Sequence, residues 1–207
     1  RLKEFLNEPD EWESGKKKFE TYALVFKPPI SFIELKEKAN EAATARAKTP
    51  AFYAEDWYQS YPFATDVPKS GSWELVRRET VPGSTSKVLS DQKALIADKP
   101  TLTPTSFAAL AALLVGQYLE HGIKLYDGKG HYGRTSTSAA SGGPVYLGYV
   151  DAYGADVYAL DDASGSVGLS VSRNFCLCFL PVTLNFVSIG ANHQASYRFC
   201  LLLVVRQ

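Results

Sequence analysis

Thiols and an imidazole are grouped near the end of the chain, where they could bind a metal. Cys176 and Cys178 are separated by one residue, and His193 and Cys200 follow them. A structural zinc site takes four ligands and commonly has two residues between paired cysteines, so this spacing does not predict zinc. An odd total of three cysteines is not typical of a secreted disulfide framework either. We interpret them as partly buried thiols.

The other residue types that could catalyse a reaction do not form a catalytic pattern. The three histidines are not arranged as His-Glu-x-x-His, and no Gly-x-Ser-x-Gly sequence is present. Gly128 and Gly130 lack the third glycine of a dinucleotide site, and no Gly-x-x-x-x-Gly-Lys loop occurs. Asp161 and Asp162 could bind a cation, although paired aspartates before a Ser-Gly step are typical of a solvated turn. We therefore predict no enzyme activity, no metal and no cofactor.

Composition and charge narrow the class of protein. Of the 207 residues, 45% are hydrophobic and 21% are charged, which is typical of a globular domain. The 22 Lys and Arg balance the 22 Asp and Glu, so no net field favours nucleic acid as a partner. Apolar stretches at 107–115 and 175–189 are too short or too interrupted to span a bilayer, so we expect no transmembrane segment. Because the chain begins at Arg1 and has no Met, the compartment stays open between cell surface and cytoplasm.

Helix signals dominate the first half of the chain. A charged segment over 1–20 is expected to be partly helical. Ser31 and Glu34 form a capping-box pattern ahead of a helix that stops before Pro50. Residues 50–100 are rich in Pro, Ser and aromatics, which predicts loops with short extended pieces.

The second half begins with a helix and then changes to strands. Apolar residues predict a buried helix over 107–120, which starts after Ser106 and ends at Gly122. Residues 167–172 alternate between apolar and small residues, which predicts a half-buried strand. Residues 198–206 are apolar at both odd and even positions, which predicts a central strand covered on both faces. Helices followed by strands predict an α+β fold.

Lys and Glu are distributed unevenly along the chain. Residues 1–129 hold all 14 Lys and all 12 Glu, and residues 130–207 hold none of either. A soluble segment of this length would ordinarily carry on the order of nine of these residues. A β-rich core lowers that number, yet loops and sheet edges normally keep some Lys.

The genetic code offers a more specific explanation for this composition. If the adenines of Asn codons of the form AAY are randomised, each becomes an NNY codon, which cannot encode Lys, Glu, Gln, Met or Trp. Between residues 130 and 207, only Gln194 and Gln207 lie outside the set that NNY codons encode. The tract therefore has the composition that adenine-specific randomisation would leave.

With these features the C-terminal part resembles the variable proteins of diversity-generating retroelements. The resemblance is carried by the tract without Lys and Glu, the apolar ending over 199–206, and the Ser-Tyr-Arg run that ends at Arg198. It covers roughly residues 100–207. The Gly-Gly-x-Trp and Gly-Phe-Arg signatures common in bacterial members are absent, so the resemblance is to an archaeal or otherwise divergent branch.

The resemblance implies a C-type lectin-like fold with irregular antiparallel sheets, preceded by a helical N-terminal region. We expect a helical and loop-rich region at 1–100 packed on the core, and a ligand-binding domain at 101–207. It also implies ligand binding without chemistry, and a C-terminal segment diversified by adenine-specific mutagenic retrohoming. The partner would be a protein or surface ligand set by the variable residues.

Calcium-dependent sugar binding is not expected of this chain. The second half contains no Glu-Pro-Asn loop and no Trp-Asn-Asp run. An affinity for any ligand that is lost with EDTA and restored by calcium would contradict this expectation.

On a variable binding face we expect exposed Tyr, Asn, Asp, Ser, His, Phe and Cys, because such side chains give adaptable contacts. A first group of candidates shares a position near the C-terminus: Asn174, Phe175, Cys176, Cys178, Asn185, Ser188, Asn192, His193, Ser196 and Tyr197. A second group precedes it: Tyr153, Tyr158, Asp161 and Asp162. Part of this set can pack in the core instead, and Phe175 and Cys178 are the clearest cases.

Two other functions stay open. A fixed surface adhesin or phage-type structural protein would have a similar β-rich domain but invariant codons. An enzyme on the related formylglycine-generating scaffold would use Cys176 and Cys178 with copper, and on a strand both thiols would share one face. The pair is closer in sequence than the cysteines of that family, which counts against the enzyme. Metal analysis of purified protein would separate this case.

Overall fold

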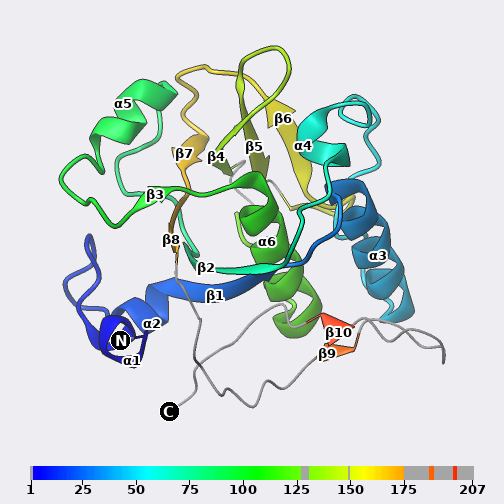
Figure 1. The fold of residues 1–207 in the computed structure, drawn as a ribbon, viewed down its shortest axis with the longest axis horizontal. Coiled ribbons are helices and arrows are strands. Elements are labelled where there is room, and N and C mark those ends of the chain that lie inside the picture. Colours follow the sequence, from blue (N-terminus) through cyan, green and yellow to red (C-terminus); the bar gives the residue numbers. More distant parts are fainter. Residues whose placement is uncertain (1, 127–130, 149, 175–186, 189–197, 200–207) are drawn as a thin grey trace.

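Helices and strands alternate along the protein and build two separate sheets. The computed structural model describes residues 2–126, 131–148, 150–174, 187–188 and 198–199. Within these ranges there are two four-stranded sheets, both rich in antiparallel pairs, and a further two-stranded pair (Figure 1). The mixed composition agrees with the predicted α+β class.

The two longest of the six described helices begin at serine caps. The bounds of all six are α1 (Leu2–Asn7), α2 (Lys18–Thr21), α3 (Phe32–Ala45), α4 (Pro62–Thr65), α5 (Leu89–Ala94) and α6 (Phe107–His121). At the start of α3, Ser31 Oγ accepts a hydrogen bond from the main-chain nitrogen of Glu34 at 3.1 Å. Ser106 Oγ accepts one from Ala109 at the start of α6, and Gly122 ends that helix with a φ of 67°. Both helices are therefore confirmed. Within the described residues no helix is long and apolar enough to cross a membrane.

The first sheet combines strands from both halves of the chain. Its order is β1 (Tyr22–Lys27), β2 (Ser72–Arg77), β8 (Val171–Asn174) and β3 (Thr103–Pro104), with antiparallel neighbours. Strand β1 differs from the helices and loops predicted for residues 1–100, whereas β2 falls among the short extended pieces predicted over 50–100. The difference arises because the apolar run in β1 pairs with β2 along its whole length, from Tyr22 opposite Arg77 to Lys27 opposite Ser72.

The second sheet is built only from residues after 130. Its order is β6 (Asp156–Ala159), β5 (Pro144–Gly148), β4 (Tyr132–Ser138) and β7 (Val167–Leu169). Strands β4, β5 and β6 pair antiparallel, and β7 pairs parallel to β4. Ser170 alone separates β7 from β8, so one extended segment contributes a strand to each sheet. This confirms the strand predicted over 167–172.

A short antiparallel pair is formed by β9 (Val187–Ser188) and β10 (Arg198–Phe199). The central strand predicted over 198–206 begins with β10. The rest of that prediction lies outside the described residues.

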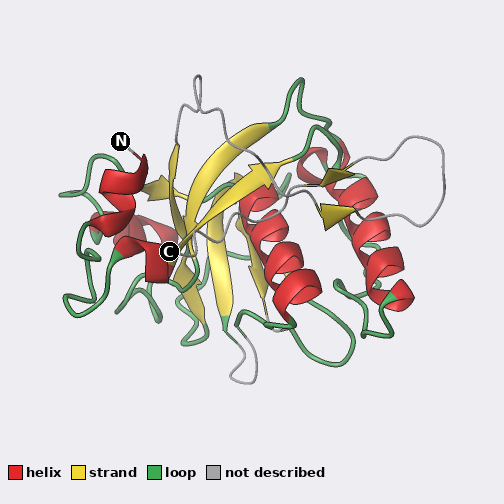
Figure 2. Cartoon of the chain, turned by 90° about the horizontal axis from the view of Figure 1, so that it is seen from below, coloured by secondary structure: helices red, strands yellow, loops and turns green. Residues whose placement is uncertain are grey.

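Helix α6 lies in the core and contacts both sheets. It contacts β1 and β2 of the first sheet, β4 and β5 of the second, and helix α3. Figure 2 shows the two longest helices side by side next to the strands. Leu110 and Leu113 of α6 are fully buried, and each contributes about 2 kcal/mol through apolar burial. Gly133 allows β4 to approach this helix, because a Cβ there would lie 2.8 Å from Leu110 Cδ2. The helix thus supports the second sheet from one face.

Candidate ligand-binding face

The second sheet has two faces of different chemistry. Side chains alternate along a strand, and Leu147 and Val157 point to the face that is buried against the core. Tyr146 and Tyr158 have the opposite parity and are direct cross-strand partners. Tyr132 of β4 lies on this second face as well, opposite Gly148. We call this surface the tyrosine face and define it by Tyr132, Tyr146, Asp156 and Tyr158.

The three tyrosine rings form one contact cluster. The ring centroids of Tyr132 and Tyr146 are 5.3 Å apart with an edge-to-face angle of 76°. Those of Tyr146 and Tyr158 are 5.8 Å apart and stacked at 28°, and Tyr132 meets Tyr158 edge-on at 5.8 Å. Such pairs add about 0.5–1.5 kcal/mol beyond area burial, so the rings hold one another in place. Tyr158 is 42% exposed, Tyr146 only 8% and Tyr132 intermediate, so Tyr158 is the most accessible of the three rings.

A second aromatic pair lies beside the tyrosine face. Tyr53 comes from the loop after α3, and its ring meets that of Tyr153 edge-on at 6.1 Å. Both rings are exposed. The loop is fixed there by main-chain hydrogen bonds between Tyr53 and Ala155 and between Ala155 and Ala51. Tyr53 also contributes to the raised pKa of Tyr158, after burial and two carboxylates, so it lies near that residue.

Carboxylates give this region a negative character. Burial, followed by the charges of Glu55 and Asp151, raises the pKa of Asp156 from 3.8 to about 6, and a hydrogen bond with Tyr132 opposes this rise. Glu55 reaches β6, because its Oε2 accepts a hydrogen bond from the main-chain nitrogen of Val157 at 3.4 Å. Asp156 therefore holds its proton to a higher pH than an ordinary aspartate does.

Asp161 and Asp162 lie against a buried arginine. Arg134 is fully buried, and its Nη2 donates to the main-chain oxygen of Asp162 at 2.6 Å. Both carboxylates lie 3.5 Å from the guanidinium, with their side chains 45% and 43% exposed. Asp161 Oδ1 also accepts a hydrogen bond from the main-chain nitrogen of Leu89 at the start of α5. Asp161 therefore links α5 to β4 through Arg134, and Asp162 contacts β4 through the same arginine.

The structure brings together part of the predicted set. Tyr158 lies on the tyrosine face, and Tyr153 lies beside it. Asn174 ends β8 in the first sheet, opposite Glu74, and Ser188 lies in β9. Eight predicted residues lie outside the described residues: Phe175, Cys176, Cys178, Asn185, Asn192, His193, Ser196 and Tyr197.

Several residues of this region were not among the predicted candidates. Tyr132, Tyr146 and Asp156 lie on β4, β5 and β6 and point to the same face of the sheet as Tyr158. Knowledge of the strand register would have identified them. Tyr53 and Glu55 come from a loop about one hundred residues earlier, and no local pattern marks them.

The arrangement is suited to binding. The tyrosines offer ring faces for apolar or cationic groups and hydroxyls for hydrogen bonds, while the carboxylates attract positive charge. Burial raises the pKa of the Tyr146 and Tyr158 hydroxyls further above neutral pH, where tyrosine is already a protonated donor. In the part of the chain that the structure describes, no group of three or more His, Cys, Asp or Glu could hold a metal ion.

Comparisons with protein-family models, with curated proteins and with solved structures found no match to this chain.

Proposed function

We propose that this protein is a receptor-type ligand-binding protein whose C-terminal segment is diversified by adenine-specific mutagenic retrohoming. The observation that carries the proposal is the absence of Lys and Glu from residues 130–207, against 14 Lys and 12 Glu before them. Under this proposal the chain has a C-type lectin-like fold and binds without catalysing a reaction.

The geometry of the second sheet supports a binding face on a fixed scaffold. All four of its strands lie within the tract that lacks Lys and Glu. Its inner positions, such as Leu147 and Val157, are fully buried, and changes there would leave cavities that cost about 1–3 kcal/mol each. Exposed positions such as Tyr153 and Tyr158 can change with little effect on stability. A diversified protein needs this separation of roles.

The flanking DNA provides the test. We expect a near-repeat of the sequence encoding residues 140–207 close to the gene, with a reverse transcriptase gene beside it. The repeat should differ from the gene mainly where the repeat carries adenine. A complete genomic neighbourhood without a repeat would contradict the proposal, and would favour a fixed adhesin or structural protein.

A further inference from the structure

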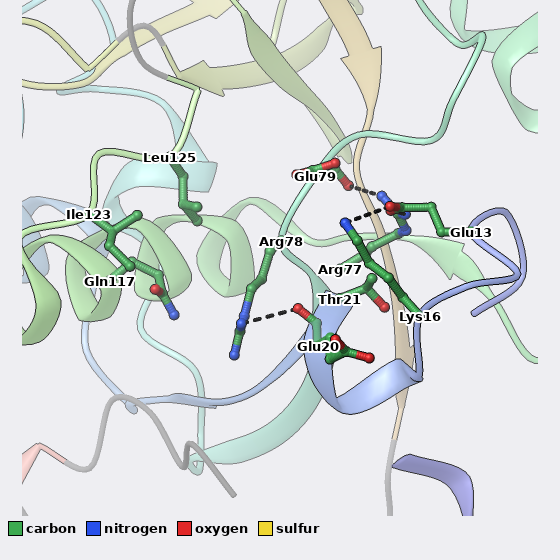
Figure 3. A pocket seen from close by; sticks show the side chains of 10 residues that line it. All are labelled: Glu13, Lys16, Glu20, Thr21, Arg77, Arg78, Glu79, Gln117, Ile123 and Leu125. Carbon is green, nitrogen blue, oxygen red and sulfur yellow. Dashed lines mark hydrogen bonds and ion pairs between the residues drawn. The ribbon is translucent and has the colours of Figure 1, made fainter. Parts of the chain in front are cut away.

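A pocket lies away from the tyrosine face, where the end of β2 approaches the end of α6. It has a volume of about 230 Å³. Figure 3 shows the Arg78 side chain between Gln117, Ile123 and Leu125 on one side and the remaining lining residues on the other. Every residue that lines it precedes residue 126, outside the tract that lacks Lys and Glu.

Arg78 has unused capacity to bind an anion. Its Nη1 donates to the main-chain oxygen of Glu20 at 3.2 Å, and its Nε is buried without a partner in the described residues. Burial lowers the pKa of the guanidinium, and no carboxylate within the described ranges offsets this effect. Arg78 is partly buried, and a partly buried positive charge is stabilised when an anion binds beside it.

Gln117 is a second unsatisfied group at the same pocket. Its side chain projects from the last turns of α6 and is only 2% exposed. The Nε2 atom has no hydrogen-bond partner among the described residues. Buried amides are nearly always paired, and a ligand with an acceptor group in this pocket would pair this one.

The carboxylates around the pocket are already engaged. Glu13 lies 2.6 Å from Arg77 Nη2 and 2.6 Å from Lys16 Nζ. The hydrogen bond with Glu13 is the largest cause of the raised pKa of Lys16, and the negative charge of Glu79 raises this pKa further. The carboxylate of Glu20 accepts a hydrogen bond from the main chain at the start of its own helix, α2. The charge of Arg78 is therefore the one that these groups leave unmatched.

We propose that this pocket binds a small organic carboxylate. The carboxylate accepts hydrogen bonds from Arg78 Nε and from the Gln117 amide, and the apolar body of the ligand packs on Ile123 and Leu125. Glu13, Glu20 and Glu79 line the same pocket, and their negative charges repel phosphate more than a singly charged anion. The site is independent of the proposed function, because it shares no residue with the tyrosine face.

The test uses 3-phenylpropionate as the probe and the Arg78 Nε–H signal in a ¹⁵N-correlated NMR spectrum as the readout. We expect a saturable shift of this signal with the carboxylate, and none with the neutral 3-phenylpropionamide. Arg78→Leu and Gln117→Leu should each weaken binding about tenfold or more in calorimetry, because each removes a hydrogen bond to a charged group. Gln117→Leu removes an unpaired amide, so this variant keeps the fold even if Arg78→Leu does not.

Arg46→Leu is the matched control. It removes the same charge from the end of α3, where Arg46 pairs with Glu120 at 3.8 Å, and should leave the affinity unchanged. The proposal is overturned if the wild-type signal shows no saturable shift, if the amide binds as tightly as the acid, or if Gln117→Leu binds like the wild type.

Discussion

Asp156 carries a carboxyl group whose proton affinity makes stability depend on pH. Its pKa is about 6 in the folded protein, above the ordinary value of 3.8. Between these values the folded state binds more protons than the unfolded state, so the free energy of unfolding falls as the pH rises through this window. The unfavourable contribution is fully present above pH 6 and is relieved below about pH 4.

We expect Asp156→Asn to be more stable than the wild type at pH 7.5, a condition we choose about 1.5 units above the folded pKa. The gain should be about 1 kcal/mol, less than the full pKa shift implies, because solvent screens a partly exposed group. The asparagine keeps an oxygen that can accept the hydrogen bond from Tyr132. Urea denaturation of both proteins over a pH series measures the difference. An equal difference on both sides of the window would show that the charge of Asp156 is not its cause.

Single side chains of the tyrosine face differ in how well the sequence predicts them. Tyr153 and Tyr158 are recognisable as exposed candidates from their residue type and their place between small and acidic residues. Tyr132 and Tyr146 are not, because the β4–β5 register is irregular between Arg134 and Ser138 and cannot be read from the sequence. The raised pKa of Asp156 depends on Glu55, which only the fold brings to β6.

Arg134 is one of the residues that fasten helix α5 and the residues before it to the second sheet. Its Nη1 donates to the main-chain oxygen of Lys87 at 2.9 Å and to Gln92 Oε1 at 3.2 Å. We expect Arg134→Met to lower the free energy of unfolding by about 2–3 kcal/mol, because these buried acceptors lose their donor. Amide hydrogen exchange within α5 should accelerate more than exchange within α6.

Arg46→Met is the control for this variant, since Arg46 makes a partly exposed ion pair with Glu120 at 3.8 Å. It should change the free energy of unfolding by less than about 1 kcal/mol. Unchanged exchange in α5 of Arg134→Met would mean that other contacts hold this helix.

The end of α6 depends on a residue with positive φ. Gly122 has a φ of 67°, and its hypothetical Cβ would meet no atom within 4 Å, so substitution costs backbone strain alone. Gly122→Ala should destabilise the protein by about 1 kcal/mol in thermal or urea unfolding. Gly15→Ala is the comparison, because that Cβ also meets nothing within 4 Å and the φ of Gly15 lies outside the positive region. Equal costs for the two variants would argue against a strained helix end.

Helices and strands are predictable where the residues that determine them are neighbours in the sequence, and unpredictable where they depend on distant partners. Helices α3 and α6 were predicted from Ser31, Ser106 and Gly122, which act on the residues next to them. Strand β1 was missed because its six residues become a strand only through pairing with β2, about fifty residues later. The division of 167–174 between two sheets at Ser170 likewise depends on partners elsewhere in the chain.

Of the two proposed binding sites, only one lies in the tract without Lys and Glu. The residues of the tyrosine face lie inside the tract, and the pocket lined by Arg78 and Gln117 lies entirely before it. We therefore expect ligand contacts on the tyrosine face to vary between sibling proteins, and the carboxylate site to stay the same.

The most direct test of the central claim is to sequence many sibling copies of this gene. We predict substitutions confined to codons in 130–207 and concentrated at exposed positions such as Tyr153 and Tyr158, together with the C-terminal candidates from Asn174 onward. Codons for Leu147, Val157 and the pocket residues should be constant. Substitutions scattered evenly over residues 1–207 would contradict the account.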